Sequence, residues 1–163
     1  MSLVYLLLGA NLGDRFSQMS RAFNEIDSQI GSVIKCSALY QTEAWGKEEE
    51  PPYLNQVVCL ETKLALHDLL RTINQIEDKL GRTRKLKWES RLIDIDILFY
   101  DDVIVNDPDL IVPHPYIHKR KFTLVPLCEI AADLVHPVLK KSMEELLTDL
   151  DDPLSVKRIT GTC

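Results

Sequence analysis

One run of alternating apolar residues constrains the fold of this chain more than any other feature, because two aspartates are set inside it. The run covers residues 93–99, and its apolar side chains recur at every second position: Ile93, Ile95, Ile97 and Phe99. This period predicts a β-strand with all four side chains on one face. Asp94 and Asp96 then share the opposite face, roughly 6–7 Å apart at Cα. Two like charges at that distance repel each other, so we expect the chain to place positive charge between them.

The first hundred residues predict the element order strand, helix, strand, strand, helix, strand. The expected strands are residues 3–8, 33–40, 53–63 and a segment from residue 92, and the expected helices are residues 16–30 and 66–80. Asp14 is placed as an N-cap, and Gly31 and Gly81 end the two helices. This order is typical of the split βαβ, or ferredoxin-like, α+β fold, in which two helices cover one face of an antiparallel sheet.

The length of 163 residues predicts a single domain over residues 1–163. Ser142 and Glu145 have the spacing of a capping box, which predicts a further short helix among C-terminal additions to the core. Residues from about 151 to 163 are expected to form a tail or the start of a linker.

The charge balance and the N-terminus bear on partners and location. The chain has 19 Lys and Arg against 25 Asp and Glu, a net charge of −6, which argues against non-specific nucleic-acid binding as its main role. The apolar run at residues 3–8 is too short to span a membrane and follows no basic region of a signal peptide. We therefore expect a cytoplasmic protein with neither a membrane nor a nucleic-acid partner.

A basic segment directly before the aspartate strand is the first source of positive charge. Residues 81–91 carry five basic side chains against Glu89: Arg82, Arg84, Lys85, Lys87 and Arg91. A solvated loop is the simpler interpretation of an isolated run of charge. The position beside Asp94 and Asp96 favours a metal–triphosphate site, in which carboxylates hold the metal and guanidinium groups hold phosphate oxygens. Mg²⁺ is the second source of positive charge. The sequence contains no P-loop motif, so a nucleotide would not be held by a P-loop.

A proline-flanked histidine follows in the segment VPHPYIHKRKF, residues 112–122. His114 and His118 are four residues apart, as helical zinc ligands are, but the prolines on both sides of His114 argue against a regular helix there. We therefore reject zinc. A rigid histidine with Arg120 nearby suits an anion contact, and a plain surface turn is the alternative.

Aromatic and amide side chains gather in or beside the same loops: Trp45, Tyr53, Asn55, Trp88 and Phe122. An aromatic-lined slot with one amide suits a flat heterocycle, whereas core or loop packing is the alternative. The polar, proline-ended stretch at residues 42–52 is long enough to act as a lid over such a slot.

With these motifs in place, the chain resembles the 6-hydroxymethyl-7,8-dihydropterin pyrophosphokinase family of folate biosynthesis. The resemblance extends from Tyr5 to Leu150 and rests on the order and spacing of these segments: LLLGANLGD, SALYQTEAWG, PPYLNQVV, IEDKLGRTR, WESRLIDIDIL, VPHPYIHKRKF and LVPLCEIAADLVHP. It implies a ferredoxin-like αβα sandwich with a βαββαβ core. It also implies Mg²⁺-dependent transfer of diphosphate from ATP to 6-hydroxymethyl-7,8-dihydropterin, with release of AMP.

The same resemblance implies roles for individual residues. Two Mg²⁺ ions would be held by Asp94 and Asp96. Catalytic roles fall to Arg82, Arg91, Asp94 and Asp96. Contacts with ATP fall to Leu70, Asn74, Arg84, Lys87, Trp88, Arg91, Ile97, His114 and Arg120. The pterin pocket is formed by Thr42, Ala44, Trp45, Tyr53, Asn55 and Phe122. Glu77 organises the site without taking part in the chemistry.

Two questions stay open at the level of the sequence. The chain is expected to act as a monomer or as part of a longer folate-pathway polypeptide. The rival function is a non-catalytic ferredoxin-like module, although the aliphatic neighbours of Ile95 do not match the paired aromatics of an RNA-binding sheet. A regulatory nucleotide sensor would need the same aspartates and arginines, and would bind ATP without consuming it.

Overall fold

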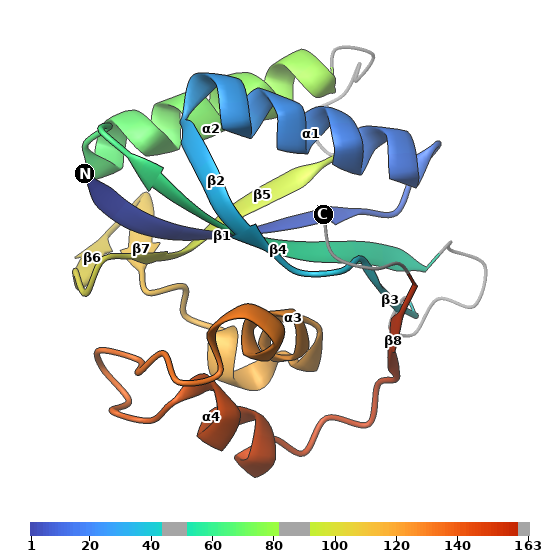
Figure 1. The fold of residues 1–163 in the computed structure, drawn as a ribbon, viewed down its shortest axis with the longest axis vertical. Helices are drawn as coiled ribbons and strands as arrows, with labels where there is room; N and C mark the ends of the chain where they lie inside the picture. Colours follow the sequence, from blue (N-terminus) through green and yellow to red (C-terminus); the bar gives the residue numbers. More distant parts are fainter. Residues whose placement is uncertain (44–51, 82–91, 160–163) are drawn as a thin grey trace.

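The computed structural model describes residues 1–43, 52–81 and 92–159 (Figure 1). The strands are β1 (Ser2–Ala10), β2 (Gly31–Cys36), β3 (Tyr40–Thr42), β4 (Tyr53–Thr62), β5 (Asp94–Tyr100), β6 (Val105–Asp107), β7 (Leu110–Val112) and β8 (Val156–Arg158). The helices are α1 (Arg15–Gln29), α2 (Leu66–Leu80), α3 (Lys121–Ala131) and α4 (Met143–Asp149), with a 3₁₀ turn, η1, at Ile117–Lys119. The predicted lid and basic loop lie almost wholly outside these residues.

One antiparallel sheet forms the centre of the molecule. Its strands lie in the order β5-β1-β4-β3-β8, and β2 also pairs with β4. α1 and α2 lie on one face of this sheet, and α3 and α4 lie on the other (Figure 1). Because β2 and β3 together take the place of the second strand, the predicted order of strands and helices is confirmed, and so is the α+β ferredoxin-like fold class.

Each face of the sheet has its own hydrophobic core. Leu6 and Leu8 of β1 pack with the apolar stripes of α1 and α2. Tyr5 and Leu7, which alternate with them, pack with α3 and α4. The alternation of side chains along β1 therefore buries both faces, which explains why this strand is apolar throughout. Within the described ranges, no helix is long and apolar enough to cross a membrane.

The two helices on the first face begin and end close to where the sequence predicts. The Asp14 side chain caps α1 by accepting a hydrogen bond from the Ser17 N–H at 3.1 Å, and Gly81 is the C-cap of α2. Gly31 does more than end α1, because it is also the first residue of β2. A Cβ at this position would lie 1.9 Å from the Glu61 carbonyl oxygen, so only glycine lets β2 approach β4 this closely.

The single second strand predicted from the sequence is wrong in one respect, because the chain leaves the ladder between β2 and β3. The Ser37 N–H donates to Val57 O at 2.9 Å, and the Ser37 hydroxyl accepts from the Val57 N–H at 3.0 Å. The Ala38 N–H donates to the Glu129 carboxylate of α3 at 2.9 Å. Side chains thus replace strand partners, and β3 resumes one residue out of register with β4. Tyr40 Oη also donates to Glu129, at 2.5 Å, which ties β3 to α3.

β5 departs from the predicted pattern at a bulge in its pairing with β1. Leu6 lies opposite Ile97, but Tyr5 lies opposite Phe99, so the ladder shifts by one residue between them. Phe99 therefore joins the core formed with α3 and α4, while Ile95 and Ile97 stay in the core formed with α1 and α2. The prediction that Phe99 shares a face with the isoleucines is wrong, because the bulge reverses the alternation.

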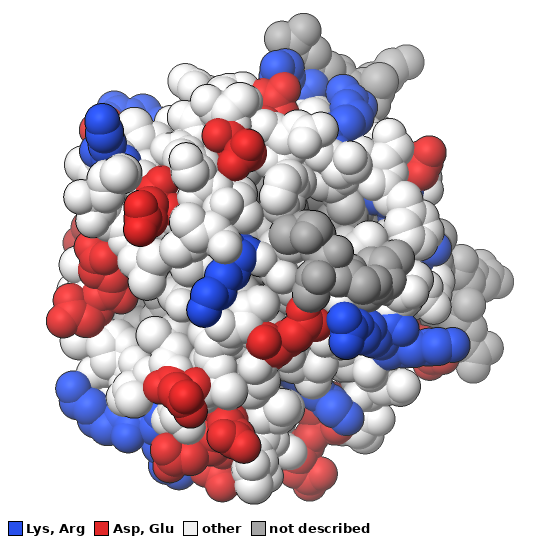
Figure 2. All heavy atoms as spheres, in the orientation of Figure 1, with Lys and Arg blue, Asp and Glu red and all other residues white. Residues whose placement is uncertain are grey.

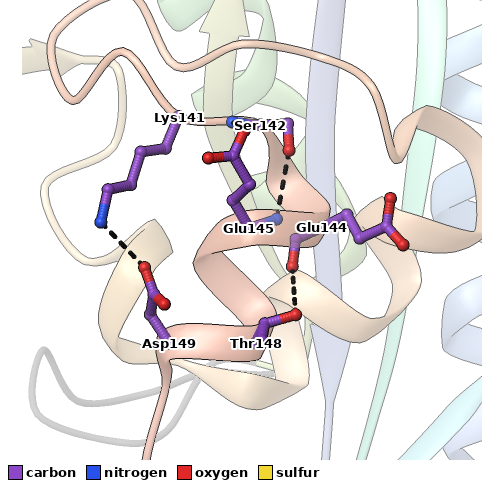
Figure 3. Close-up of polar contacts among 6 residues, drawn as sticks. All are labelled: Lys141, Ser142, Glu144, Glu145, Thr148 and Asp149. Atoms are coloured by element: carbon purple, nitrogen blue, oxygen red, sulfur yellow. Dashed lines mark hydrogen bonds and ion pairs between the residues drawn. The ribbon is translucent and has the colours of Figure 1, made fainter.

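α4 confirms the predicted capping box. The Ser142 hydroxyl accepts from the Glu145 N–H at 3.1 Å (Figure 3), and the Glu145 carboxylate accepts from the Ser142 N–H at 3.3 Å. Lys141 and Asp149 form an ion pair at 2.8 Å across the same helix (Figure 3). With its start fixed in this way, α4 buries Met143 in the core that it shares with α3.

The C-terminal segment, predicted as a tail or linker, contains a strand of the sheet. β8 pairs with β3 in antiparallel register, with Val156 opposite Thr42 and Arg158 opposite Tyr40. The strand is three residues long and carries two basic side chains. Its sequence therefore has too little apolar alternation to be recognised without the fold.

Candidate functional site

A cavity of about 580 Å³ opens between the sheet and the start of α3. Residues of four strands, of the position after β3, of α3 and its N-terminal flank, and of the C-terminal segment line it: Leu7, Gly9, Thr42, Glu43, Tyr53, Asn55, Asp94, Asp96, Arg120, Phe122 and Leu154. Residues predicted to bind metal, pterin and ATP thus line the same cavity. Its volume is in the range of cavities that bury small organic ligands.

Asp94 and Asp96 extend from β5 towards this cavity. In the β1–β5 pairing, Asp94 lies opposite Gly9 and Asp96 lies opposite Leu7. Both aspartates line the same cavity, which confirms that they share one face of the strand. The Asp96 side chain is 41% exposed, so solvent reaches the pair and moderates the repulsion between the two carboxylates.

A buried carboxylate from α2 holds the backbone between the two aspartates. Glu77 is 8% exposed, and its Oε2 accepts a hydrogen bond from the Ile95 N–H at 2.9 Å. β5 is an edge strand, so half of its N–H groups point away from β1 and need partners other than a strand. Glu77 thus fixes β5 at the residue that separates Asp94 from Asp96. The organising role of Glu77 in the site stays a prediction.

The opposite end of the cavity presents hydrogen-bonding groups from β3 and β4. Asn55 is buried, and its Nδ2 donates to Leu8 O at 3.3 Å, which leaves its Oδ1 and its second N–H for a ligand. Thr42 is also buried, and its Oγ1 finds no hydrogen-bond partner among the described residues. A buried hydroxyl without a partner costs free energy, so a polar ligand in this cavity would relieve that cost.

Aromatic side chains supply two walls of the same cavity. Tyr53 stands at the start of β4 and Phe122 in the first turn of α3, and both line the cavity. The Arg120 guanidinium carbon lies 5.4 Å from the Phe122 ring centre and 5.0 Å from the Tyr116 ring centre. Stacking on two rings holds the guanidinium group at the cavity wall, where it remains available for an anion.

A second cavity, of about 290 Å³, shares Asp96 with the first. Its lining is mostly apolar and comes from α2, β5, β7 and the loops around them: Leu70, Ile95, Asp96, Ile97, Pro108, Asp109, Leu110, Ile111, His114 and Pro115. Three of the predicted ATP contacts, Leu70, Ile97 and His114, therefore meet here. An apolar slot of this kind suits a heterocyclic base.

His114 is held in one orientation beside Asp96. Its Nδ1 accepts a hydrogen bond from the Tyr116 N–H at 3.2 Å, and its backbone N–H donates to Leu98 O at 3.0 Å. Burial and the nearby charge of Arg120 lower the pKa of His114 to about 4, so the ring is neutral at pH 7. Because Nδ1 accepts, the proton is on Nε2, which lies 3.9 Å from Asp96 Oδ2. The ring therefore presents a fixed donor close to the point where the two cavities meet.

Some predicted residues do not reach these cavities or lie outside the described ranges. Asn74 lies one turn after Leu70 on α2, is exposed, and lines neither cavity. The predicted residues outside the described ranges are Ala44, Trp45, Arg82, Arg84, Lys87, Trp88 and Arg91.

Sequence reasoning missed part of the cavity lining. The sequence predicts that the first strand ends at residue 8, but Gly9 belongs to β1 and lies opposite Asn55. A glycine that follows a run of leucines in a buried strand is the signal that could have identified it, because such glycines often mark a close approach. Leu7, Glu43 and Leu154 gave no such signal, since only the fold brings them to the cavity.

The fold and the site together define a class: an α+β protein with a ferredoxin-like sheet, in which paired carboxylates lie beside an aromatic-walled cavity and a second, apolar one. The profile of the 7,8-dihydro-6-hydroxymethylpterin-pyrophosphokinase (HPPK) family matches residues 5–132. The chain belongs to this family.

Two relatives that match over most of their length are also named as pyrophosphokinases. The 2-amino-4-hydroxy-6-hydroxymethyldihydropteridine pyrophosphokinase of Aquifex aeolicus is 39% identical over 145 residues, which cover 89% of this chain and 90% of that protein. The protein of the same name from Methylorubrum extorquens is 39% identical over 160 residues, which cover 98% of this chain and 99% of that protein.

A solved structure supports the fold. The crystal structure of wild-type Plasmodium falciparum HPPK-DHPS with STZ-DHP matches with a TM-score of 0.74 and 16% identity, over 90% of this chain and 43% of that chain. At this identity the likeness concerns the fold alone.

Proposed function

We propose that this chain transfers the diphosphoryl group of ATP to 6-hydroxymethyl-7,8-dihydropterin in folate biosynthesis, at the junction of the two cavities. Family membership and the named relatives support the reaction, and the position of Asp96 in both cavity walls supports the place. The pterin hydroxymethyl oxygen forms a bond to the β-phosphorus, and the bond from this phosphorus to the oxygen that bridges to the α-phosphorus breaks. The hydroxyl proton is released to solvent, and AMP leaves with the bridging oxygen and the electron pair of the broken bond.

The larger cavity is assigned to the pterin. Tyr53 and Phe122 offer apolar faces to the flat ring, and stacking orients the ring without using its polar edge. Asn55 offers one acceptor and one donor, which matches an amide-like ring edge. The Thr42 hydroxyl gains the partner that it lacks among the described residues.

The smaller cavity is assigned to the nucleotide. Leu70 and Ile97 give apolar contacts to the base. His114 donates through Nε2–H, and Arg120 donates through its guanidinium group, to phosphate oxygens near the cavity junction. In-line transfer depends mainly on positioning and on charge neutralisation, and these residues supply both.

The carboxylates fit Mg²⁺ that arrives with ATP. Asp94 and Asp96 bring oxygen ligands to one cavity wall, and within residues 1–43, 52–81 and 92–159 no cluster of three His, Cys, Asp or Glu residues could hold a metal. Mg²⁺ prefers a few carboxylates plus substrate phosphates to an all-protein cage, so the pair suits two ions that also bind the triphosphate. When bound, the ions neutralise phosphate charge and polarise the reacting oxygens. Glu77 keeps the two carboxylates in place through Ile95.

Residues outside the described ranges complete the proposal, and their roles rest on the sequence motifs alone. The arginines among them would meet the charge that develops on the transferred group. They are Arg82 and Arg91 for catalysis, Arg84, Lys87 and Trp88 for ATP, and Ala44 and Trp45 for the pterin.

The proposed setting is the cytoplasm, where ATP is supplied, with a monomeric enzyme whose described site walls all come from one chain. Membership of a longer folate-pathway polypeptide stays a prediction. On the face drawn in Figure 2, acidic and basic side chains of the described residues are interspersed and form no continuous basic surface for a nucleic acid.

The rival nucleotide sensor differs in that it binds ATP without turnover, and a conservative substitution separates the two functions. Asp96→Asn removes one charge at the cavity junction and keeps the size of the side chain. We expect it to lower AMP formation by at least about 100-fold, with unchanged thermal unfolding. Asp102→Asn, at an exposed position just beyond β5, is the matched control and keeps normal turnover.

Near-normal turnover by Asp96→Asn would remove Asp96 from the reaction. Binding of ATP by the wild-type protein, with no AMP formed when the pterin is present, would favour the sensor.

A further inference from the structure

We infer that the C-terminal segment, residues 152–158, is a wall of the pterin cavity, and that Leu154 is a positioning residue that sets the affinity for the pterin ring. This inference rests on the proposed function, because it adds a determinant to the same site. The family profile ends at residue 132, so it does not cover this segment.

Leu154 lines the cavity from a short stretch in which the residues on either side of it are exposed. It lines the cavity together with Thr42 and Phe122. It is half-buried, whereas its neighbours Pro153 and Ser155 are exposed. An apolar side chain in this position excludes water from one side of the cavity, which favours a flat, largely apolar ring.

Asp152 fixes the beginning of the segment to the start of α3. Its Oδ2 accepts a hydrogen bond from the Lys121 N–H at 3.2 Å, and its Oδ1 accepts from the Leu154 N–H at 2.9 Å. The Lys121 N–H belongs to the first turn of α3, where N–H groups have no partner within the helix. One carboxylate therefore sets the position of Leu154 relative to the helix that carries Phe122.

β8 fixes the other end of the segment to β3. Val156 lies opposite Thr42 in the antiparallel pairing, and the Ile159 N–H donates to Leu39 O at 2.9 Å. Figure 1 shows the path: the chain leaves α4, returns to the sheet and runs beside β3 as its last strand. The strand that supplies the Thr42 hydroxyl, which has no hydrogen-bond partner among the described residues, is thus held on its outer side by the same segment.

The segment therefore bridges two walls of the pterin cavity, with Phe122 at one end and Thr42 at the other. Leu154 lies between the two anchors and lines the larger cavity only. A change at this position should act on the pterin and leave the nucleotide unaffected. That asymmetry distinguishes a positioning role from a general structural one.

Steady-state kinetics of the full chain, with ATP and pterin varied separately, test the inference. We expect Leu154→Ala to raise the pterin KM about tenfold, since removing methylene groups from an apolar pocket weakens binding to this degree. The ATP KM and kcat should stay close to their wild-type values. Leu154→Met keeps the volume and should keep the pterin KM. Leu139→Ala, the same truncation in the loop before α4 and away from both cavities, is the matched control.

The outcomes separate this inference from the proposed function. A wild-type pterin KM in Leu154→Ala would overturn the inference and leave the proposed function intact, as would an equal rise in the KM of both substrates. Failure of the wild-type protein to form AMP with the pterin would overturn the proposed function itself. Should Leu154→Ala not fold, Asp152→Asn weakens the anchor instead: a raised pterin KM supports the inference, and an unchanged one contradicts it.

Discussion

Gly9 lies directly opposite Asn55 in the β1–β4 pairing, and a Cβ on Gly9 would come within 2.9 Å of the Asn55 side-chain nitrogen. That nitrogen is held in place by its hydrogen bond to Leu8 O. On its other side, Gly9 lies opposite Asp94 of β5. A residue without a side chain therefore lets the amide proposed to bind the pterin and a carboxylate proposed to bind metal line one cavity.

Gly9→Ala is expected to raise the pterin KM about tenfold or more while the fold stays intact. The added methyl group displaces the Asn55 amide from the position in which its free groups face the cavity. The cost of that displacement is offset in part, because alanine loses about 0.5–1 kcal/mol less conformational free energy in a strand than glycine does. Pterin kinetics and thermal unfolding measure the two effects separately.

Gly13→Ala is the control, because it should lower stability and leave the pterin KM unchanged. Gly13 has a φ of 62°, and a Cβ there would meet nothing within 4 Å. The variant should lose about 1–2 kcal/mol of stability through backbone strain and keep its pterin KM. A wild-type pterin KM in Gly9→Ala would show that Asn55 does not bind the pterin as proposed.

Glu77→Ala should lower the free energy of unfolding by about 1–3 kcal/mol, because the buried Ile95 N–H loses its acceptor. Turnover should fall as well, since β5 is no longer fixed between Asp94 and Asp96. Glu77→Gln keeps an acceptor oxygen and should lose less of both. Denaturant unfolding and kcat are the measurements, and Asp78→Ala, at the next, exposed position of α2, should stay within about 0.5 kcal/mol. Equal losses in the two Glu77 variants would mean that the charge of Glu77 matters more than its hydrogen bond.

His136 makes stability depend on pH. It is buried, and its Nδ1 accepts hydrogen bonds from the N–H groups of Val138 and Leu139, each at 3.1 Å. Burial, and then the nearby His118, lower the pKa of His136 in the folded state. Below its ordinary pKa of about 6.5, the unfolded chain binds a proton that the folded chain does not, so the free energy of unfolding falls as the pH falls.

Denaturant unfolding between pH 7.5 and pH 5.5 measures this effect. A single histidine contributes a slope of at most about 1.4 kcal/mol per pH unit. His136→Asn keeps an acceptor near Nδ1 but cannot be protonated, so its slope should be smaller. Some slope should remain, because His114 is also held neutral. An identical slope in the variant and the wild type would contradict this account.

The regular elements could be predicted from the sequence because their signals are local. The Asp14 cap, the Gly81 C-cap and the capping box of α4 depend on residues that lie within one or two turns of each other. The alternation that places Asp94 and Asp96 on one face is likewise a property of a few consecutive residues. The resemblance to the family predicted that the two aspartates share a site with Thr42, Tyr53, Asn55 and Phe122. In the fold, these residues line one cavity.

The features that were missed depend on partners far away in the chain. Phe99 changes face because of a bulge against β1, and the break after Cys36 is held by Glu129 of α3. β8 exists because β3 offers an edge to pair with, and Leu154 reaches the cavity through that pairing together with the Asp152 hydrogen bonds at the start of α3. A local sequence pattern cannot predict a bulge, a free sheet edge or a C-terminal segment that pairs with the sheet, since each is decided by the tertiary structure.

The most direct test of the central claim is ³¹P NMR of the protein with ATP, Mg²⁺ and 6-hydroxymethyl-7,8-dihydropterin, beside a sample without the pterin. We predict that AMP and a pterin diphosphate form together, and only when the pterin is present. Formation of ADP would contradict attack at the β-phosphorus. Unchanged ATP, from folded protein that binds the nucleotide, would contradict the pyrophosphokinase activity and favour the nucleotide sensor.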